Sequence, residues 1–295
     1  SLSIWDDFVR QPNRTFKNTT GDVAVDHYHR YKEDIKLMAE MGLKAYRFSI
    51  AWTRILPEGR GEVNQKGVEF YSNLIDELLK YNIEPIITIY HWDLPQVLQE
   101  EYGGWESRKI IDDFLYYAEV LFENFGDRVK YWIGLNEQNV FVGLGYRDGY
   151  FPPGIKDIKR MHQVNHIVNL ANATIIKRFH ELNIKGQIGP SFAFPVLYAL
   201  DNRPENVLAT EQSLDVNVWY WMDAYILGRY PKTALAYLKN QFGIELDIRE
   251  GDFDILKSGR PDFVGVNYYQ SHTFAANVPN AEAGEPDQFD LLYSI

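Results

Sequence analysis

Short apolar runs alternate with long amphipathic segments along this chain, and that alternation limits the fold more than any other feature. Runs rich in β-branched and aromatic residues predict buried strands at 44–52, 84–92, 129–137, 187–192 and 262–269. The spacing of apolar residues outside these runs predicts helices at 29–40, 66–80, 107–125, 157–182, 215–228 and 231–241. Strands that alternate with helices form parallel sheets, because each helix returns the chain to the same end of the sheet. The sequence therefore predicts an α/β fold.

Polar residues collect where the predicted strands end, which favours a (β/α)8 barrel over an open doubly wound sheet. Enzymes built on such barrels place their active sites at the C-terminal ends of the strands. No Gly-x-Gly-x-x-Gly turn follows any strand, as the dinucleotide-binding form of the open sheet would require. The polar strand-end residues are Arg47 and Trp52, His91-Trp92-Asp93, Asn136-Glu137, and Asn267-Tyr268-Tyr269.

The number of predicted strands is too small to close such a barrel. Five strands are found where eight are needed, so we interpret residues 1–295 as a single, partial barrel domain from a longer protein. Residues 271–290 are polar and contain several Gly and Pro residues, which predicts an exposed loop. The final stretch, "DQFDLLYSI", indicates a loop or an edge rather than a last helix.

Composition and charge exclude several classes of protein. The chain has 295 residues, 45% of them hydrophobic and 15% aromatic, so it can bury a large core. A formal net charge of −11 opposes a nucleic-acid partner, because phosphate binding needs a basic surface. The absence of cysteine fits a cytoplasmic location. No apolar run of ~18 residues and no secretory signal at the start indicate that no membrane is involved.

The apolar run "KYWIGLNEQN" ends one predicted strand in Asn136-Glu137. Glycoside hydrolysis commonly uses two carboxyl groups, one of which donates a proton to the departing oxygen. A glutamate at a strand end, buried and near another carboxylate, suits the proton donor, and Asn136 could bind a sugar hydroxyl. Alternatively, Glu137 caps the next helix or pairs with a cation. The residues alone leave both interpretations open.

His91-Trp92-Asp93 stands at the end of another predicted strand. Imidazole and indole N–H groups can donate hydrogen bonds to hydroxyls, and an indole face can stack on the apolar face of a sugar. Core packing is an equally good explanation for Trp92. We expect Asp93 to cap a helix that begins at Leu94-Pro95.

Arg47 lies inside an otherwise apolar strand, and a buried guanidinium requires an anionic partner. That partner is either a structural carboxylate or a catalytic one, and Tyr269 could serve the same carboxylate through its hydroxyl. His162 and His166 are four residues apart on one helix, but the glutamate of the His-Glu-x-x-His zinc motif is missing. We therefore expect neither a metal nor any other cofactor.

Three long blocks resemble successive parts of glycoside hydrolase family 1. They are "GDVAVDHYHRYKEDIKLMAEMGLKAYRFSIAWTRILPEG", "YHWDLPQVLQEEYGGWESRKIIDDFLYYAEVLFENFGDRVKYWIGLNEQN" and "PDFVGVNYYQ". The resemblance covers nearly the whole chain in order, which makes it highly specific. It implies a (β/α)8 barrel that hydrolyses β-glycosides with retention of configuration.

The resemblance also implies roles for individual residues. Glu137 matches the family's general acid/base after the fourth strand. His91, Trp92 and Asn136 match residues that bind the sugar. The residues that match those around the nucleophile are Arg47, Asn267 and Tyr269.

Two departures from the family pattern bear on specificity and activity. Gln138 stands where the family has proline, and this variant, like "PSFAFPVLYALDNRPENVLA" at 190–209, resembles bacterial 6-phospho-β-glucosidases. The family's first strand, its last two strands and the segment with the nucleophilic glutamate have no match here, so only about strands 2–6 are present.

We therefore expect a retaining 6-phospho-β-glucosidase that acts on small phosphorylated β-glucosides such as cellobiose 6-phosphate. An unphosphorylated β-glucosidase is the alternative. A homo-oligomer is compatible with the sequence. The isolated 295 residues, which lack the nucleophile, are expected to be inactive; as a non-catalytic fragment they would expose apolar strand edges.

Overall fold

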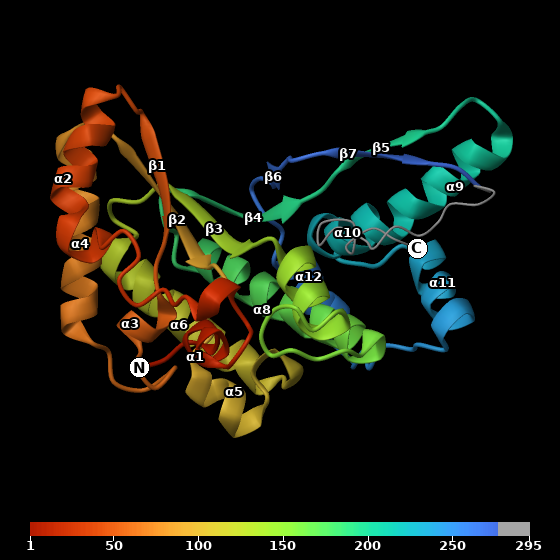
Figure 1. The fold of residues 1–295 in the computed structure, drawn as a ribbon, viewed down its shortest axis with the longest axis horizontal. Coiled ribbons are helices and arrows are strands. Elements are labelled where there is room, and N and C mark those ends of the chain that lie inside the picture. The colour runs from red at the N-terminus through yellow and green to blue at the C-terminus, as the bar shows by residue number, and fades with distance from the viewer. Residues whose placement is uncertain (277–295) are drawn as a thin grey trace.

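Five parallel strands form one sheet in a computed structural model of the chain, which describes residues 1–276 (Figure 1). The strands lie in the sheet in their sequence order, β1-β2-β3-β4-β6. All five predicted strands are confirmed, with ends that differ by a few residues. Their bounds are Ala45–Ser49 (β1), Glu84–Tyr90 (β2), Tyr131–Asn136 (β3), Gln187–Ala193 (β4) and Gly265–Asn267 (β6).

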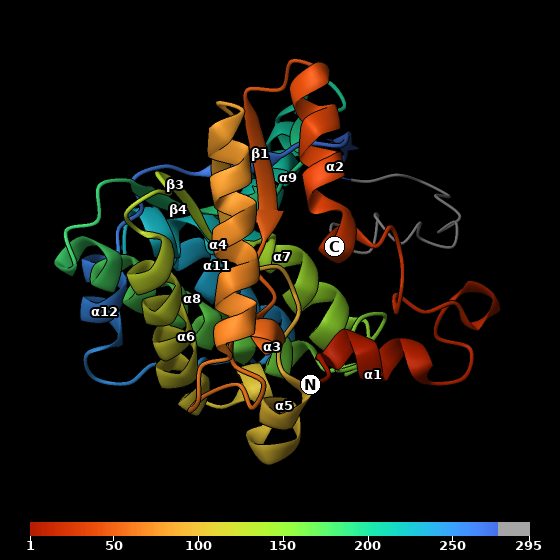
Figure 2. The same ribbon diagram turned by 90° about the vertical axis from the view of Figure 1, so that its left-hand side faces the viewer.

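Helices that precede or connect these strands form an outer layer. Neighbouring helices of the layer contact one another in the same order as the strands. Figure 2 shows the first two, α2 and α4, on either side of β1. Each helix has an apolar face toward the sheet; on α4, for example, Tyr71, Leu74 and Leu78 are buried at helical spacing. The layer consists of α2 (His27–Glu40), α4 (Gln65–Lys80), α6 (Lys109–Phe125), α8 (Ile158–Glu181) and α12 (Asp252–Ser258).

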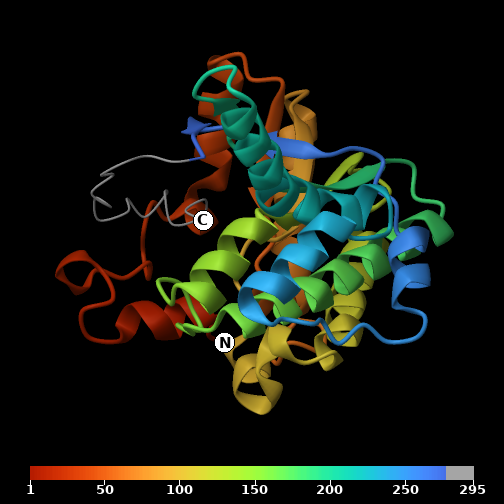
Figure 3. The ribbon, with the colours of Figure 1, turned by 90° about the vertical axis from the view of Figure 1, so that its right-hand side faces the viewer.

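The predicted helix at 215–228 begins earlier than the sequence indicated. Helix α9 (Pro204–Leu214) continues through a π-helical turn (Asp215–Trp219) into α10 (Tyr220–Ile226). A proline at the first helical position is a common start signal, and Pro204 provides it. The last predicted helix is confirmed as α11 (Lys232–Phe242). Figure 3 shows these helices facing the viewer, in teal to light blue.

A second, two-stranded sheet was not predicted. Strand β5 (Val196–Ala199) pairs in parallel with β7 (Ser271–Phe274), beside α9. The predicted loop at 271–290 is therefore wrong for its first four residues. They alternate between exposed and half-buried, so no apolar run revealed the strand, and its partner is distant in sequence. Residues 277–290 of that loop and the stretch "DQFDLLYSI" lie outside the described residues.

Short helices lie near the C-terminal ends of the strands. Most of them are too short to give a periodic signal, and the sequence predicted only the one expected from Leu94-Pro95, which begins at Gln96. The first connects the start of the chain to the loop after β2, because the Ile4 amide donates to the Leu94 carbonyl (2.8 Å). They are α1 (Ile4–Arg10), α3 (Trp52–Ile55), α5 (Gln96–Tyr102) and α7 (Gln138–Val142).

The sheet is open at both ends within residues 1–276. Strands β1 and β6 each have one neighbour in the sheet, and on β6 Val266 is 56% exposed. The five strands are parallel, lie in sequence order and each follow a helix. This alternation of helix and strand is the repeat from which a (β/α)8 barrel is built. The fold is thus a partial barrel, as predicted. Among the described residues, no helix is both long and apolar enough to cross a membrane.

Candidate active site

The C-terminal end of β3 carries a backbone conformation that requires explanation. Asn136 is the last residue of the strand, and Glu137 follows in the left-handed region, with φ 47° and ψ 58°. This region is uncommon for a residue with a side chain and is often found at functional sites. The Glu137 amide donates to the Ser191 carbonyl at the end of β4 (2.6 Å), which stabilises the turn. Glu137 is 6% exposed, so its carboxylate lies in a protected position.

The Glu137 carboxylate receives its hydrogen bonds from the last strand of the sheet. Asn267, at the end of β6, donates from Nδ2 to Glu137 Oε1 (2.6 Å), and the Tyr269 hydroxyl lies 3.4 Å from the same oxygen. Ser191 donates to Asn267 Oδ1 (3.2 Å) and so fixes the orientation of this amide. The negative charge of Glu137, followed by partial burial, raises the pKa of Tyr269. Asn267 and Tyr269 thus hold Glu137, and their contact with a nucleophile stays a prediction.

Asn136, at the end of β3, contacts side chains from β1 and from the end of β2. Its Oδ1 accepts from Arg47 Nη2 on β1 (2.5 Å), and its Nδ2 lies 3.1 Å from His91 Nε2. Its carbonyl oxygen accepts from Trp92 Nε1 (2.8 Å). Arg47 also donates from Nε to Thr88 Oγ1 (2.9 Å). The sequence gives no signal for Thr88, because a threonine inside a β-strand is ordinary.

Arg47 therefore has neutral direct partners, in contrast to the carboxylate that we expected. Burial lowers the pKa of its guanidinium, and the nearby Glu137 opposes this effect. Both strand-end amides, Asn136 and Asn267, lie between the cation and the carboxylate, since Asn267 Nδ2 is also 3.4 Å from Asn136 Oδ1. Arg47 and Glu137 are thus connected through these two side-chain amides rather than by a direct ion pair.

His91 and Trp92 lie beside this cluster at the end of β2. Partial burial, followed by the charge of Arg47, lowers the pKa of His91, so the imidazole is neutral at pH 7. Its Nε2 then accepts from Asn136, which leaves the proton on Nδ1 and makes that atom a donor. Trp92 adopts φ 79°, another left-handed residue at a strand end, and its ring contacts Phe151 (centroids 5.3 Å apart).

The expected helix cap at Asp93 is wrong. Helix α5 begins at Gln96 with Pro95 as its N-cap, and Asp93 Oδ2 instead accepts from the backbone amide of Trp52 (3.0 Å). This bond connects the segments that follow β1 and β2. Burial raises the pKa of Asp93 to about 6, although backbone N–H groups oppose the shift. A long-range backbone donor of this kind has no signal in the sequence.

The buried histidines have partners that are not metals. His162 Nδ1 lies 3.1 Å from the Tyr220 hydroxyl, and His166 lies between Tyr230 and Asp252. Within residues 1–276, no group of three or more His, Asp or Glu side chains is placed to hold a metal ion.

Comparison with known proteins gives one consistent result. The family model described as glycosyl hydrolase family 1 matches residues 1–290. An aryl-phospho-β-D-glucosidase, BglC, from Bacillus subtilis is 53% identical over 275 residues, which is 93% of this chain and 57% of the relative. β-Glucosidase A from Acetivibrio thermocellus is 44% identical over 282 residues, 96% of this chain and 62% of the relative.

A solved structure is also similar. The crystal structure of the rice β-glucosidase Os3BGlu6 superposes with a TM-score of 0.87 at 34% identity, covering 99% of this chain and 64% of the rice chain. The chain therefore spans about three fifths of the length of these relatives.

Proposed function

Because the chain belongs to glycosyl hydrolase family 1, we propose that the full-length protein is a retaining β-glycosidase in which Glu137 is the general acid/base. One observation carries this proposal. Glu137 is a buried carboxylate at the C-terminal end of a barrel strand, and it is held by Asn267 beside a row of amide and imidazole groups. A buried carboxylate with neutral donors around it is suited to exchange a proton with a bound sugar.

In the proposed mechanism Glu137 acts twice. Protonated Glu137 first gives its proton to the glycosidic oxygen while a second carboxylate attacks the anomeric carbon, and the aglycone leaves as an alcohol or phenol. Glu137, now ionised, then removes a proton from water, whose oxygen displaces the second carboxylate from the anomeric carbon. The sugar is released with retained configuration, and Glu137 is protonated again.

The second carboxylate is proposed to come from chain outside residues 1–295. It must lie roughly 5–5.5 Å from Glu137 in a retaining enzyme. Among the described residues, the hydrogen-bond partners of the Glu137 carboxylate are Asn267 and Tyr269, and neither is an acid. Arg47 would then orient the second carboxylate together with these two residues. We accordingly propose that residues 1–295 alone are catalytically inactive.

His91, Trp92 and Asn136 are proposed to bind the sugar. His91 lies at the strand ends, partly open to solvent, and among residues 1–276 its Nδ1 N–H has no hydrogen-bond partner, so it can bind a hydroxyl. Asn136 contacts Arg47 and His91, so it also fixes the spacing of the groups around the sugar. These interactions require no cofactor.

We propose that the sugar carries a 6-phosphate. The 53% identity to a protein named as an aryl-phospho-β-D-glucosidase supports this substrate, as does Gln138 in place of the family's proline. The 44% identity to a protein named as a β-glucosidase favours the unphosphorylated alternative. Phosphorylated sugars are retained inside cells, and a cytoplasmic location is part of the same proposal.

Kinetics of the full-length protein test these proposals. We expect 4-nitrophenyl β-glucoside 6-phosphate to be hydrolysed with a higher kcat/KM than 4-nitrophenyl β-glucoside; the reverse order would favour the alternative substrate. Glu137→Gln should lower kcat by about 10²-fold or more. Glu84→Gln, at the opposite end of the neighbouring strand, is the matched control and should retain wild-type rates. Normal turnover by Glu137→Gln would contradict its role.

A further inference from the structure

Gln138 directly follows Glu137, and its side-chain amide is fully engaged. The residue is 1% exposed. Its Nε2 donates to Asn165 Oδ1 (2.5 Å) and to Asn169 Oδ1 (2.7 Å), and its Oε1 accepts from the Tyr225 hydroxyl. Both amide protons and the amide oxygen are therefore used, which leaves this side chain one orientation.

The acceptors on α8 belong to a row of buried polar residues on that helix. Asn165 and Asn169 are four residues apart and thus share a face, and both are at most 1% exposed. Burying polar groups on a helix is costly unless they are hydrogen-bonded. The row runs along His162, Asn165, His166 and Asn169. Asn172 is also buried on this helix, but its side-chain amide has no hydrogen-bond partner among residues 1–276.

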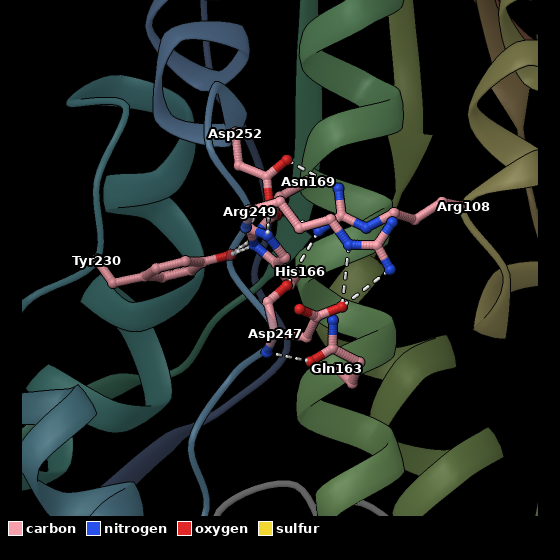
Figure 4. A network of polar contacts seen from close by, with 8 residues as sticks. All are labelled: Arg108, Gln163, His166, Asn169, Tyr230, Asp247, Arg249 and Asp252. Carbon is pink, nitrogen blue, oxygen red and sulfur yellow. Dashed lines mark hydrogen bonds and ion pairs between the residues drawn. The ribbon is translucent and has the colours of Figure 1, made fainter.

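From Asn169 the hydrogen bonds continue through Tyr230 and His166 to Asp252 (Figure 4). Asn169 Nδ2 donates to the Tyr230 hydroxyl (2.9 Å), which lies 2.8 Å from His166 Nδ1. His166 Nε2 lies 2.9 Å from Asp252 Oδ2. Burial lowers the pKa of His166, and Asp252 only partly opposes this, so the ring carries one proton at pH 7. An ionised carboxylate can only accept, which places that proton on Nε2 and makes Nδ1 the acceptor of the Tyr230 proton.

Asp252 is the negative end of this series. Burial raises the pKa of its carboxyl, but Arg108 (2.7 and 2.8 Å), the Arg249 amide (2.7 Å) and His166 outweigh burial and hold the pKa below its usual value. One N–H of Gln138 and the donors of Asn169, Tyr230 and His166 therefore point in turn toward Asp252. Hydrogen bonds aligned in this way polarise and strengthen one another.

We propose that Gln138 is a positioning residue for Glu137, fixed in place by this aligned series of buried hydrogen bonds. The turn at Glu137 is held at two points. The Glu137 amide donates to the Ser191 carbonyl in β4, and the Gln138 side chain is hydrogen-bonded to α8 and α10. Together they determine the turn after β3 and so the direction of the Glu137 carboxyl. An acid catalyst must lie within hydrogen-bond reach of the oxygen that it protonates. This inference rests on the proposed acid/base role of Glu137.

The test uses two leaving groups with the full-length protein. Dinitrophenolate departs without a proton, whereas phenolate requires one, so a misplaced acid lowers kcat/KM, which reports the step up to departure of the leaving group, only for the phenyl glycoside. Gln138→Met, which keeps the length of the side chain but not its hydrogen bonds, should lower kcat/KM for the phenyl β-glycoside about ten-fold. For the 2,4-dinitrophenyl β-glycoside, kcat/KM should change less than about two-fold.

Tyr225→Phe is the milder variant, because it removes one donor and keeps the ring against Phe192 (centroids 5.4 Å apart). It should lower the ratio of kcat/KM for the phenyl β-glycoside to kcat/KM for the 2,4-dinitrophenyl β-glycoside, about two- to five-fold. This ratio decides the question if Gln138→Met does not fold. Tyr71→Phe is the matched control: its buried hydroxyl accepts from the Ala51 amide (2.8 Å), and its loss should leave the ratio unchanged.

The outcomes separate the two proposals. An unchanged ratio in folded Gln138→Met, or in Tyr225→Phe where Gln138→Met does not fold, overturns the positioning role, as does an equal loss on both substrates. A wild-type protein that hydrolyses neither glycoside, with or without the 6-phosphate, contradicts the proposed function itself.

Discussion

Asn267 donates a 2.6 Å hydrogen bond to Glu137 across the described sheet, from the end of β6 to the end of β3. The two strands are not neighbours, because β4 lies between them and supplies Ser191, which contacts both residues. The candidate acid/base is thus held by groups from three strands at once. Its orientation depends on how the barrel curves.

Loss of the Asn267 amide should impair catalysis more than binding. We expect Asn267→Ala to lower kcat about ten-fold with a phenyl β-glycoside, because the Glu137 carboxyl loses its shortest hydrogen bond, with a smaller change in KM. Steady-state kinetics of the full-length protein measure this. Gln270→Ala, an exposed residue three positions further on, serves as the control. A rise in KM with unchanged kcat would show that Asn267 binds substrate instead.

The buried carboxyl of Asp93 should make stability depend on pH. Its folded pKa of about 6 lies above its ordinary 3.8, so the stability it contributes is complete below about pH 4 and is lost as pH rises through 6. At about 1.4 kcal/mol per pKa unit, the loss is about 3 kcal/mol.

Asp93→Asn keeps an acceptor for the Trp52 amide but cannot ionise. Its free energy of unfolding, measured with urea, should exceed that of the wild type at pH 7.5 and approach it at pH 4. Asp127→Asn, whose side chain is 72% exposed, should show no such trend. Parallel wild-type and Asp93→Asn curves across this range would refute the assignment.

Gly189 in β4 should tolerate no side chain. A Cβ at this position would lie 2.0 Å from the carbonyl oxygen of Phe263, which is backbone and cannot rotate away. We expect Gly189→Ala to reduce the free energy of unfolding by about 2–4 kcal/mol, through displacement of the segment that leads into β6. Gly21→Ala, where a Cβ meets nothing within 4 Å, is the control. Equal melting temperatures for the two variants would be inconsistent with the packing described.

The proposed nucleophile can be located by trapping. A 2-deoxy-2-fluoro-β-glycoside with a good leaving group should form a stable glycosyl-enzyme with the full-length protein, because fluorine slows the hydrolysis of this ester. Peptide mass spectrometry should find the label outside residues 1–295. Label on any carboxylate within 1–295 would disprove the proposed division of the active site.

The strands and most long helices could be predicted because each carries its own local pattern. The strand that ends at Asn136 is an apolar run, and α4 has regular helical spacing. Strand β7 has neither pattern, since its stability comes from pairing with β5. It could not be found from its own four residues.

The site could be predicted as a set of residues but not as a set of contacts. Arg47, His91, Asn136, Glu137 and Asn267 come together as expected, because parallel strands end at one edge. Which atom contacts which depends on the turns that follow the strands. The left-handed turn at Glu137 has no marker such as glycine.

The polar inner face of α8 has a consequence for how the barrel assembles. An apolar helix face can dock in several rotational settings at similar free energy, whereas the hydrogen bonds of His162, His166 and Asn169 depend on the rotational setting of the helix. Each amide left unpaired by a rotation or a one-turn slip would cost about 1–3 kcal/mol. The row therefore sets the rotation of the helix about its axis. It thereby also fixes the position of the turn that carries Glu137 relative to the sheet.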